Sequence, residues 1–526
     1  MNRLLTGLVS LLALCQVGIL NAQSPKLFVM ISVEELRSDL LIELSKQMPN
    51  NDGIKQLIES GRLYTEVLNP LLSADATASE AILQTGTTAL ANGITARQPL
   101  IKLSDGRRIT ATSALEDKSH TGYATSDRLS PLALSAPSIS DQLKQNSAGI
   151  SIVYSIAPSA EEAIIAGGQL ADGAFWIDSS TGRWASSTYY KGGFPKYIEQ
   201  LNSNSEGVVS KLNKGITWQA LYANEFQKKY SDILPNGATK SFSHTFERSN
   251  KDIIKYKESG LVNDDVVEVA NRLLNYSLLG NDQVTDLLTI HFTVSAGDNA
   301  ESDISPEVID SYYRLDRAIA NLLRIIDKSV GRSNTLIALT GNATAIERTP
   351  IIKEQRIFRP SRCKALMNMY LNAKYGHQGF IDEITPNGEV FLNHEVIKNY
   401  SPVTLEQIQT AVSNFLIDFS GIQYAIEEHR LRSEAIGNSE NRYWQSALNK
   451  ALHNNRADVI YELLPGWVIE DLSKSEGIQK YKMTATPTIF VMVHPDIKAE
   501  KIHTPIDLRE VSKKVSKVLK IRPPTP

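Results

Sequence analysis

The segment from Leu287 to Ala343 constrains the fold most, because it reads as strand, loop, helix and strand. Leu287–Val294 is a mostly apolar run, which is typical of a strand buried on both faces of a parallel sheet. The apolar residues that follow recur at the spacing of one buried helical stripe, and Gly331 stands where such a helix usually ends. Thr335–Thr340 then returns to an apolar strand. The segment therefore predicts a β-α-β unit whose loops SAGDN and TGNA lie at the carboxyl edge of an open sheet, where ligands of α/β folds bind.

The beginning of the chain predicts export. Arg3 supplies a positive charge, Leu4 to Leu20 are mostly apolar, and Ala22 ends a plausible cleavage site, so we expect residues 1–22 to be a signal peptide. Cys15 raises the alternative of a lipoprotein, but the bulky residue before it argues against lipidation. No later stretch is long and apolar enough to span a bilayer. We expect a secreted, periplasmic protein.

Composition narrows the class of partner. The chain has 526 residues, 42% hydrophobic, and a formal net charge of −3, so no basic field indicates nucleic acid. That length is sufficient for one large α/β domain with insertions. The nine histidines form no pair at the spacing of a helical metal site.

The two loops carry a resemblance to a known family. The chain is similar to the alkaline phosphatase superfamily, in particular its phosphodiesterase-like phosphomonoesterase branch. In that family the first loop reads D-x-x-x-H and the second reads T-x-D-H-G, and their residues hold a pair of zinc ions. Here the loops read Ser295–Asn299 and Thr340–Ala343, so the frame is kept and the ligands differ.

The resemblance implies an α/β fold with an alkaline-phosphatase-like core, a mostly parallel sheet with helices on both faces and inserted cap-type regions. We expect one domain over 24–526, its core formed by about 24–95, 282–350 and 456–526, and insertions at about 96–281 and 351–455. Within the second insertion the pattern predicts a helix over Tyr424–Ser433. Further on, Asp458–Leu464 and Trp467-Val468 predict two short strands around a tight turn.

Residue by residue, the family's zinc ligands are mostly missing. The six ligand positions hold Glu34, Ser295, Asn299, Asn342, Ala343 and Ala485. Only Glu34 is anionic, and zinc prefers imidazole, thiolate and carboxylate donors. The alternative role for Glu34 is to favour the start of the following helix. We therefore predict no cofactor, where the family uses two zinc ions.

The positions that would act on phosphate are changed as well. Alignment on Thr85-Gly86 places Ala76 at the family's nucleophile and Glu80 at a histidine. Thr77 is the fallback hydroxyl, although one residue along a helix points about 100° away. Arg97 stands at a phosphate-contacting asparagine, and the family's K-x-R clamp is replaced by the non-basic stretch Ala157–Glu162.

Two functions follow from this comparison. The first is a catalytically inactive protein that binds an unknown small molecule or protein partner. The second is a metal-dependent phosphomonoesterase or phosphodiesterase with a rebuilt acidic site for a harder cation such as Mg²⁺ or Ca²⁺. The candidate ligand or cation site for either consists of Glu34, Glu35, Asp75, Glu80, Arg97 and Asp298.

Overall fold

The fold is taken from a computed structural model of the whole chain. It describes residues 24–524 except for gaps at 50–51, 72–74, 103–107, 235–240, 301, 349–355, 387, 401, 435–445, 449–456, 465, 471–477 and 480. The expected signal peptide lies outside the described residues. Within them, no helix is both long enough and apolar enough to cross a membrane.

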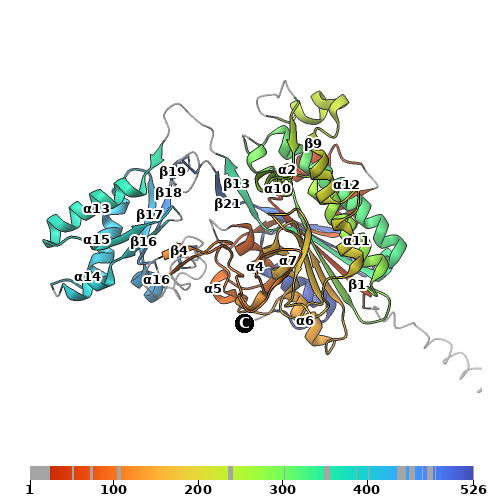
Figure 1. Cartoon of the computed structure of the whole chain (residues 1–526), viewed down its shortest axis with the longest axis horizontal. Coiled ribbons are helices and arrows are strands. Elements are labelled where there is room, and N and C mark those ends of the chain that lie inside the picture. Colours follow the sequence, from red (N-terminus) through yellow and green to blue (C-terminus); the bar gives the residue numbers. More distant parts are fainter. Residues whose placement is uncertain are drawn as a thin grey trace, which may run out of the picture.

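A large central sheet organises the main body (Figure 1). Its strands follow the order β23-β2-β22-β12-β1-β11-β6-β7-β8-β5, and β24 pairs with β2. The strands are β1 (Leu27–Glu34), β2 (Arg62–Leu68), β5 (Gly122–Tyr123), β6 (Val153–Ile156), β7 (Gly173–Ile177), β8 (Trp184–Ser187), β11 (Asp286–Thr293), β12 (Thr335–Gly341), β22 (Thr488–Val493), β23 (Glu500–Ile502) and β24 (Ile506–Asp507). The pairs around β1 are parallel, whereas β22 and β8 run antiparallel to their neighbours. The predicted mostly parallel sheet is confirmed.

The central strands are mostly apolar because both faces of the sheet are covered. In β1, Val29 and Ile31 pack into one core, whereas Phe28 and Met30 pack into the other. Side chains alternate across a strand, so a strand with a core on each side is apolar at most of its positions and not only at every second one.

Helices cover both faces. On one face lie α2 (Ser38–Ser45), α3 (Gly53–Ser60), α11 (Val262–Tyr276) and α12 (Pro306–Ser329), and on the other lie α4 (Ala76–Thr85), α6 (Ile139–Asn146), α7 (Ala160–Gly167) and α18 (Arg509–Leu519). The predicted β-α-β unit is β11, α12 and β12. In α12 the stripe Leu315, Ile319, Leu322 and Ile326 is buried, as its spacing predicts.

A separate lobe projects from the body (Figure 1). It contains the helices α13 (Pro360–Tyr375), α14 (His394–Asn399), α15 (Leu405–Ile417) and α16 (Glu428–Glu434), and the antiparallel sheet β15-β16-β18-β17 with strands Ile381–Ile384, Glu389–Leu392, Val459–Leu463 and Ile422–Glu427. A two-stranded ribbon of β13 (Thr344–Arg348) and β21 (Tyr481–Ala485) runs between lobe and body. The lobe has a hydrophobic core of its own.

Three sequence expectations differ from the structure. The helix expected over Tyr424–Ser433 begins only at Glu428, because β17 takes its first half to pair with β18. The two strands expected on either side of Pro465-Gly466 belong to different sheets: β18 pairs with β16 and β17, and β19 (Val468–Glu470) pairs with β14 (Ile357–Phe358) and β20 (Ile478–Gln479). The region expected as an insertion before residue 281 supplies β5 to β8 of the central sheet.

Candidate functional site

The candidate site lies at the carboxyl edge of the central sheet. β1 lies between β11 and β12 in parallel register, so the residues that follow these strands meet at one edge. Glu34 ends β1, Ser295 comes shortly after β11, and Asn342 follows β12 directly. Ala485 joins them through the ribbon, where it pairs with Thr344. The sheet topology therefore places these family ligand positions together.

The side chains of Ser295 and Asn299 already hydrogen-bond to other groups of the protein. The Ser295 hydroxyl donates to Glu35 Oε1 at 2.7 Å. The Asn299 amide donates to the backbone oxygen of Lys255 at 3.3 Å. Glu35 holds the left-handed backbone conformation, with φ 62°, that turns its carboxylate to the Ser295 hydroxyl. Two of the positions therefore serve as local hydrogen-bond donors.

The other family ligand positions, Asn342, Ala343 and Ala485, provide few donor atoms for a metal ion. Asn342 Oδ1 accepts from the Thr344 hydroxyl at 2.9 Å, and its Nδ2 is buried with no hydrogen-bond partner among the described residues. Ala343 and Ala485 carry no donor atom. No group of three or more His, Cys, Asp or Glu side chains in the described chain is placed to hold a metal ion. The residues present do not fit a zinc pair, which needs several anionic or imidazole donors.

Glu34 is the one carboxylate at a family ligand position. Its burial, followed by the nearby charge of Glu162, raises its pKa to about 7, although Arg97 and His291 act in the opposite direction. An uncompensated carboxyl in such surroundings takes up a proton more readily than one in water. Glu34 therefore titrates near neutral pH.

Arg97 lies in the loop after α5 (Ala89–Asn92), and its side chain contacts the first turn of α4. Its Nε donates to the Thr77 hydroxyl oxygen at 3.0 Å, and its Nη2 donates to Glu162 Oε1 at 2.7 Å. The Thr77 hydroxyl in turn donates to the same Glu162 oxygen at 2.7 Å. Asp75 caps α4 and also accepts the backbone N–H of Arg97 at 2.5 Å. Arg97, Glu162, Thr77 and Asp75, called here the Arg97 cluster, lie beside Ala76, which carries no reactive atom.

Glu162 is the residue that the sequence reasoning missed. It lies in α7 at the end of the stretch where the family's basic clamp would be, and only 1% of its side chain is exposed. Burial alone would raise its pKa, but Arg97 and then His291 outweigh it and lower the pKa to about 2. The signal was present as a pair of changes: an acid where a base is expected, and Arg97 where an uncharged amide is expected.

Two further charged residues near the site were not predicted either. Burial, and then the charge of Asp298, raises the pKa of Glu258 to about 7. The adjacent Lys257 donates to the Ser179 hydroxyl at 2.7 Å, and burial followed by the charge of Arg97 lowers its pKa. Both come from α10 (Asn250–Lys257) and the turn after it, a polar segment in which no sequence pattern pointed to chemistry.

The Glu80 side chain is fully buried in the protein interior. It accepts from the Ser32 hydroxyl at 3.1 Å and from Gln84 Nε2 at 2.8 Å, and its second oxygen lies 3.5 Å from His291 Nδ1. His291 Nδ1 also contacts the Ser32 hydroxyl at 2.8 Å. The five predicted carboxylates thus divide into Glu34 with Glu35 at the strand end, Asp75 in the Arg97 cluster, Asp298 beside Glu258, and Glu80 in the interior.

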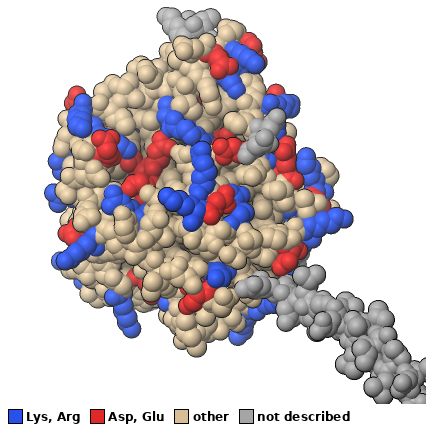
Figure 2. All heavy atoms as spheres, turned by 90° about the vertical axis from the view of Figure 1, so that its right-hand side faces the viewer, with Lys and Arg blue, Asp and Glu red and all other residues tan. Residues whose placement is uncertain are grey.

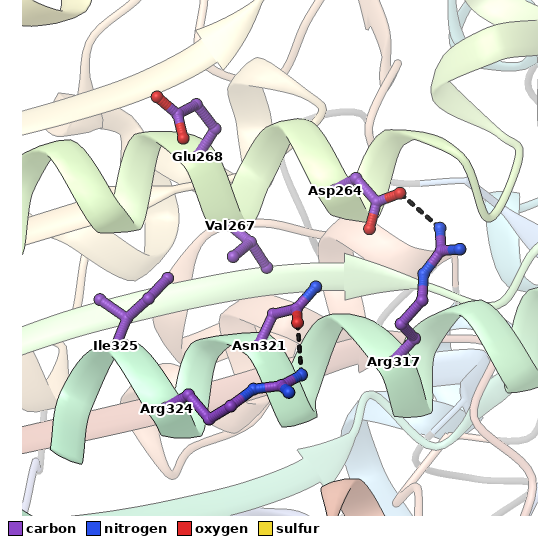
Figure 3. Close-up of a pocket in the computed structure, with 7 residues that line it drawn as sticks. All are labelled: Asp264, Val267, Glu268, Arg317, Asn321, Arg324 and Ile325. Carbon is purple, nitrogen blue, oxygen red and sulfur yellow. Dashed lines mark hydrogen bonds and ion pairs between the residues drawn. The ribbon is translucent and has the colours of Figure 1, made fainter. Parts of the chain in front are cut away.

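A groove elsewhere on the body shares no residue with this site. It has a volume of about 630 Å³ and is lined by α11 and α12 (Figure 3). Its charged side chains already have partners: Arg317 contacts Asp264 at 2.6 Å, Glu268 contacts Arg272 at 2.8 Å, and Arg324 donates to the Asn321 amide oxygen at 2.5 Å. Figure 2 shows the side of the body on which these helices lie, with basic and acidic side chains interspersed over it.

Comparison with known proteins agrees with the fold. A sequence profile of the type I phosphodiesterase / nucleotide pyrophosphatase family matches residues 28–488. The chain belongs to this family. Type I phosphodiesterase family membership places it in the alkaline phosphatase superfamily, as the two loops predicted.

Several curated relatives and solved structures are similar along most of the chain. The chain is 26% identical over 432 residues to a calcium-transporting ATPase of Myroides odoratus, covering 79% of this chain and 77% of the relative. It is 23% identical over 542 residues to the alkaline phosphatase PafA of Elizabethkingia meningoseptica, covering 97% and 95%. The crystal structure of PafA superposes with a TM-score of 0.78 at 21% identity, covering 95% of this chain and 97% of that one. Murine ectonucleotide pyrophosphatase / phosphodiesterase 5 follows at a TM-score of 0.52 and 10% identity, covering 95% and 96%.

Proposed function

We propose that this protein is a non-hydrolytic member of the type I phosphodiesterase family that uses the carboxyl edge of its sheet to bind a small molecule or a protein partner. The Arg97 cluster is the observation that carries the proposal. It fills the first turn of α4 with side chains that bond to one another, at the place where the family resemblance puts the attacking hydroxyl and the phosphate.

The first support is the donor set. Two divalent cations a few ångströms apart repel strongly, and anionic ligands make such a pair tolerable. Of the six ligand positions only Glu34 is a carboxylate, and its pKa of about 7 means that it is partly protonated at neutral pH. We expect apparent zinc affinity to be lower by many powers of ten than in a site with a full set of anionic ligands.

The second support is the missing nucleophile. Ala76 has no hydroxyl, and the Thr77 hydroxyl donates its hydrogen to Glu162 while its oxygen accepts from Arg97. A hydroxyl becomes a good nucleophile when a base or a metal removes its proton and leaves its lone pair free. The Thr77 oxygen lies in a 0% exposed side chain that is held by both neighbours.

The third support is charge. Glu162, Glu161 and Glu34 act on the Arg97 guanidinium, which is already paired with Glu162, and Lys257 is a second cation near it. A phosphate ester is an anion, and the pairing of Arg97 with Glu162 leaves less free positive charge than phosphoryl transfer requires. These carboxylates favour a ligand that offers hydrogen-bond donors or a positive charge.

The test is an assay of aryl phosphate monoester and diester hydrolysis by the purified protein with added Zn²⁺, Mg²⁺ or Ca²⁺. We expect rates at background, because neither a metal pair nor a free hydroxyl is available to lower a barrier that enzymes reduce by about 8 kcal/mol or more. Turnover that requires the Thr77 hydroxyl would show that the alignment of Ala76 with the nucleophile is an error.

A second candidate is the metal-dependent hydrolase with a rebuilt acidic site. The names of the curated relatives favour it, since three of them are called alkaline phosphatases. In that case a hard cation bound near Glu34 would support turnover, and Glu34→Ala would abolish both metal binding and activity.

The proposal includes export. The apolar segment after Arg3 supports a signal peptide of residues 1–22 and a periplasmic mature protein. The mass of the protein recovered from its producing cells tests this: a chain starting near Gln23 supports it, whereas a retained N-terminus or lipid on Cys15 contradicts it.

A further inference from the structure

Helix α13 exposes apolar side chains on the face that it does not bury. Cys363, Met367 and Leu371 pack into the core of the lobe. Leu366 and Met369 point the other way and are 38% and 68% exposed. A helix that covers a core normally presents polar residues outward, so an apolar second face calls for an explanation.

The apolar surface continues onto helix α15, which lies beside α13. The Tyr370 ring of α13 lies 5.3 Å from the Phe415 ring of α15, centroid to centroid, and both residues are partly buried at the edge of the lobe core. Leu366, Met369, Tyr370 and Phe415 form what we call the outer patch.

The charges around the outer patch have one sign on α13. That helix contains Arg362, Lys364 and Lys374 and no acidic residue. Arg362 is exposed, and Lys374 Nζ lies 5.6 Å from the centre of the Tyr370 ring. The long stems of Lys and Arg let their charges reach past an apolar surface to neighbouring anions.

The two helices that carry the outer patch lie on the side of the lobe away from the main body (Figure 1). α13 and α15 cover the side of the lobe sheet that is turned from the main body, at the far end of the lobe (Figure 1). A flat surface can therefore approach this face of the helices without meeting the body.

We propose that the outer patch docks the lobe onto an anionic phospholipid surface. An interfacial helix combines a few inserted apolar side chains with cations that reach the phosphate groups, which is the arrangement on α13. A stable protein interface buries about 800 Å² on each partner, and two exposed side chains with two half-buried rings fall well short of it. A second copy of this helix is disfavoured because it would bring like charges together.

Vesicle flotation of the full chain tests the proposal. One vesicle preparation is phosphatidylcholine alone and the other contains phosphatidylglycerol. The variants are Leu366→Ser with Met369→Ser, and Arg362→Gln with Lys374→Gln. Leu132→Ser is the matched control, because Leu132 is 55% exposed in a short helix of the main body. Residues 1–22 are common to all samples, so only differences between variants are read.

We expect the wild-type chain to float with the anionic vesicles and to lose that binding at high salt. The Leu366→Ser, Met369→Ser variant should bind about tenfold less, because two apolar side chains no longer insert. The Arg362→Gln, Lys374→Gln variant should lose the preference for anionic lipid, and Leu132→Ser should match the wild type. Equal flotation of all variants would overturn the proposal, as would a dimer in sedimentation that Met369→Ser dissociates.

Discussion

Arg97 Nη2 lies 2.7 Å from Glu162 Oε1, so one guanidinium joins the loop after α5 (Ala89–Asn92) to helix α7. Both residues differ in charge from what the family resemblance assigns to their positions: Arg97 stands where an uncharged amide is expected, and Glu162 lies in the stretch where a basic clamp is expected. Each change alone would leave a charge without a partner inside the site. Together they form an ion pair, so that neither charge is left without a partner at the edge of the sheet.

The Arg97–Glu162 pair should contribute to stability as a unit. Arg97→Met should lower the free energy of unfolding by about 1–3 kcal/mol, because it leaves a buried carboxylate unpaired, an effect that partial exposure of the arginine reduces. Arg97→Met combined with Glu162→Met should cost less than the sum of the single changes. Urea unfolding measures both, with exposed Arg183→Met as the control. Additive losses would mean that the two side chains do not interact.

Glu34 should make stability depend on pH near neutrality. Its pKa rises from 4.5 to about 7 on folding, so the native state binds the extra proton between these values. The free energy of unfolding therefore falls as pH rises through about 7. Glu34→Gln should flatten this decline by about 2 kcal/mol, while Glu258, with a similar pKa, keeps its own share.

Urea unfolding at about pH 5 and about pH 8 measures the decline in wild type and variant. If Glu34→Gln left the slope unchanged, the carboxyl would be ionised in the native state throughout this range.

His291 should stabilise the fold through its contacts with the buried Ser32 and Glu80 side chains. It is 2% exposed, and its Nδ1 lies 2.8 Å from the Ser32 hydroxyl and 3.5 Å from Glu80. His291→Leu should cost about 3 kcal/mol because it leaves Glu80 buried without its cation, and adding Glu80→Gln should recover part of the loss. Burial disfavours the charged form of His291, but Glu80 outweighs this effect and raises the pKa of His291. The pair therefore stabilises the fold fully at pH values below the pKa of an unfolded histidine, and this stabilisation is lost as pH rises through the pKa of folded His291.

Thr289 provides the control for His291. Its hydroxyl is buried without a hydrogen-bond partner among the described residues, so Thr289→Val should be neutral or slightly stabilising. Thermal unfolding of the three variants side by side checks the order. A loss on Thr289→Val as large as that on His291→Leu would point to general sensitivity of the sheet.

Restoring the hydroxyl alone should not restore chemistry. Ala76→Thr supplies the missing nucleophile, but the ligand positions still lack anionic donors, so aryl phosphate turnover should stay at background. Adding Ser295→Asp, Asn299→His, Asn342→Asp, Ala343→His and Ala485→His should raise zinc affinity, measured by competition with a chelating dye. Turnover by Ala76→Thr alone in the presence of zinc would show that the native site already binds the metals.

Much of the fold could be predicted because its signals are local. The apolar runs at β11 and β12 and the stripe of α12 are visible within one segment: burial on both faces explains the strands, and burial of one face explains the helix. The prediction of a helix over Tyr424–Ser433 was wrong for its first half, because those residues form a strand that pairs with β18, which is distant in sequence. At the site, the family resemblance pointed only to positions where this chain differs from the family motif. Glu162, Lys257 and Glu258 gain their roles from partners that the fold brings from other segments, and no spacing along the chain reveals such partners.

The number of zinc ions bound per chain tests the central claim most directly. Native mass spectrometry of the wild-type protein, purified and then incubated with zinc, counts them on the intact chain, and Glu34→Ala shows whether that carboxylate holds any. We predict that no zinc pair is retained and that Glu34→Ala changes nothing. Two zinc ions per chain, lost in Glu34→Ala and accompanied by phosphate-ester turnover, would contradict the account.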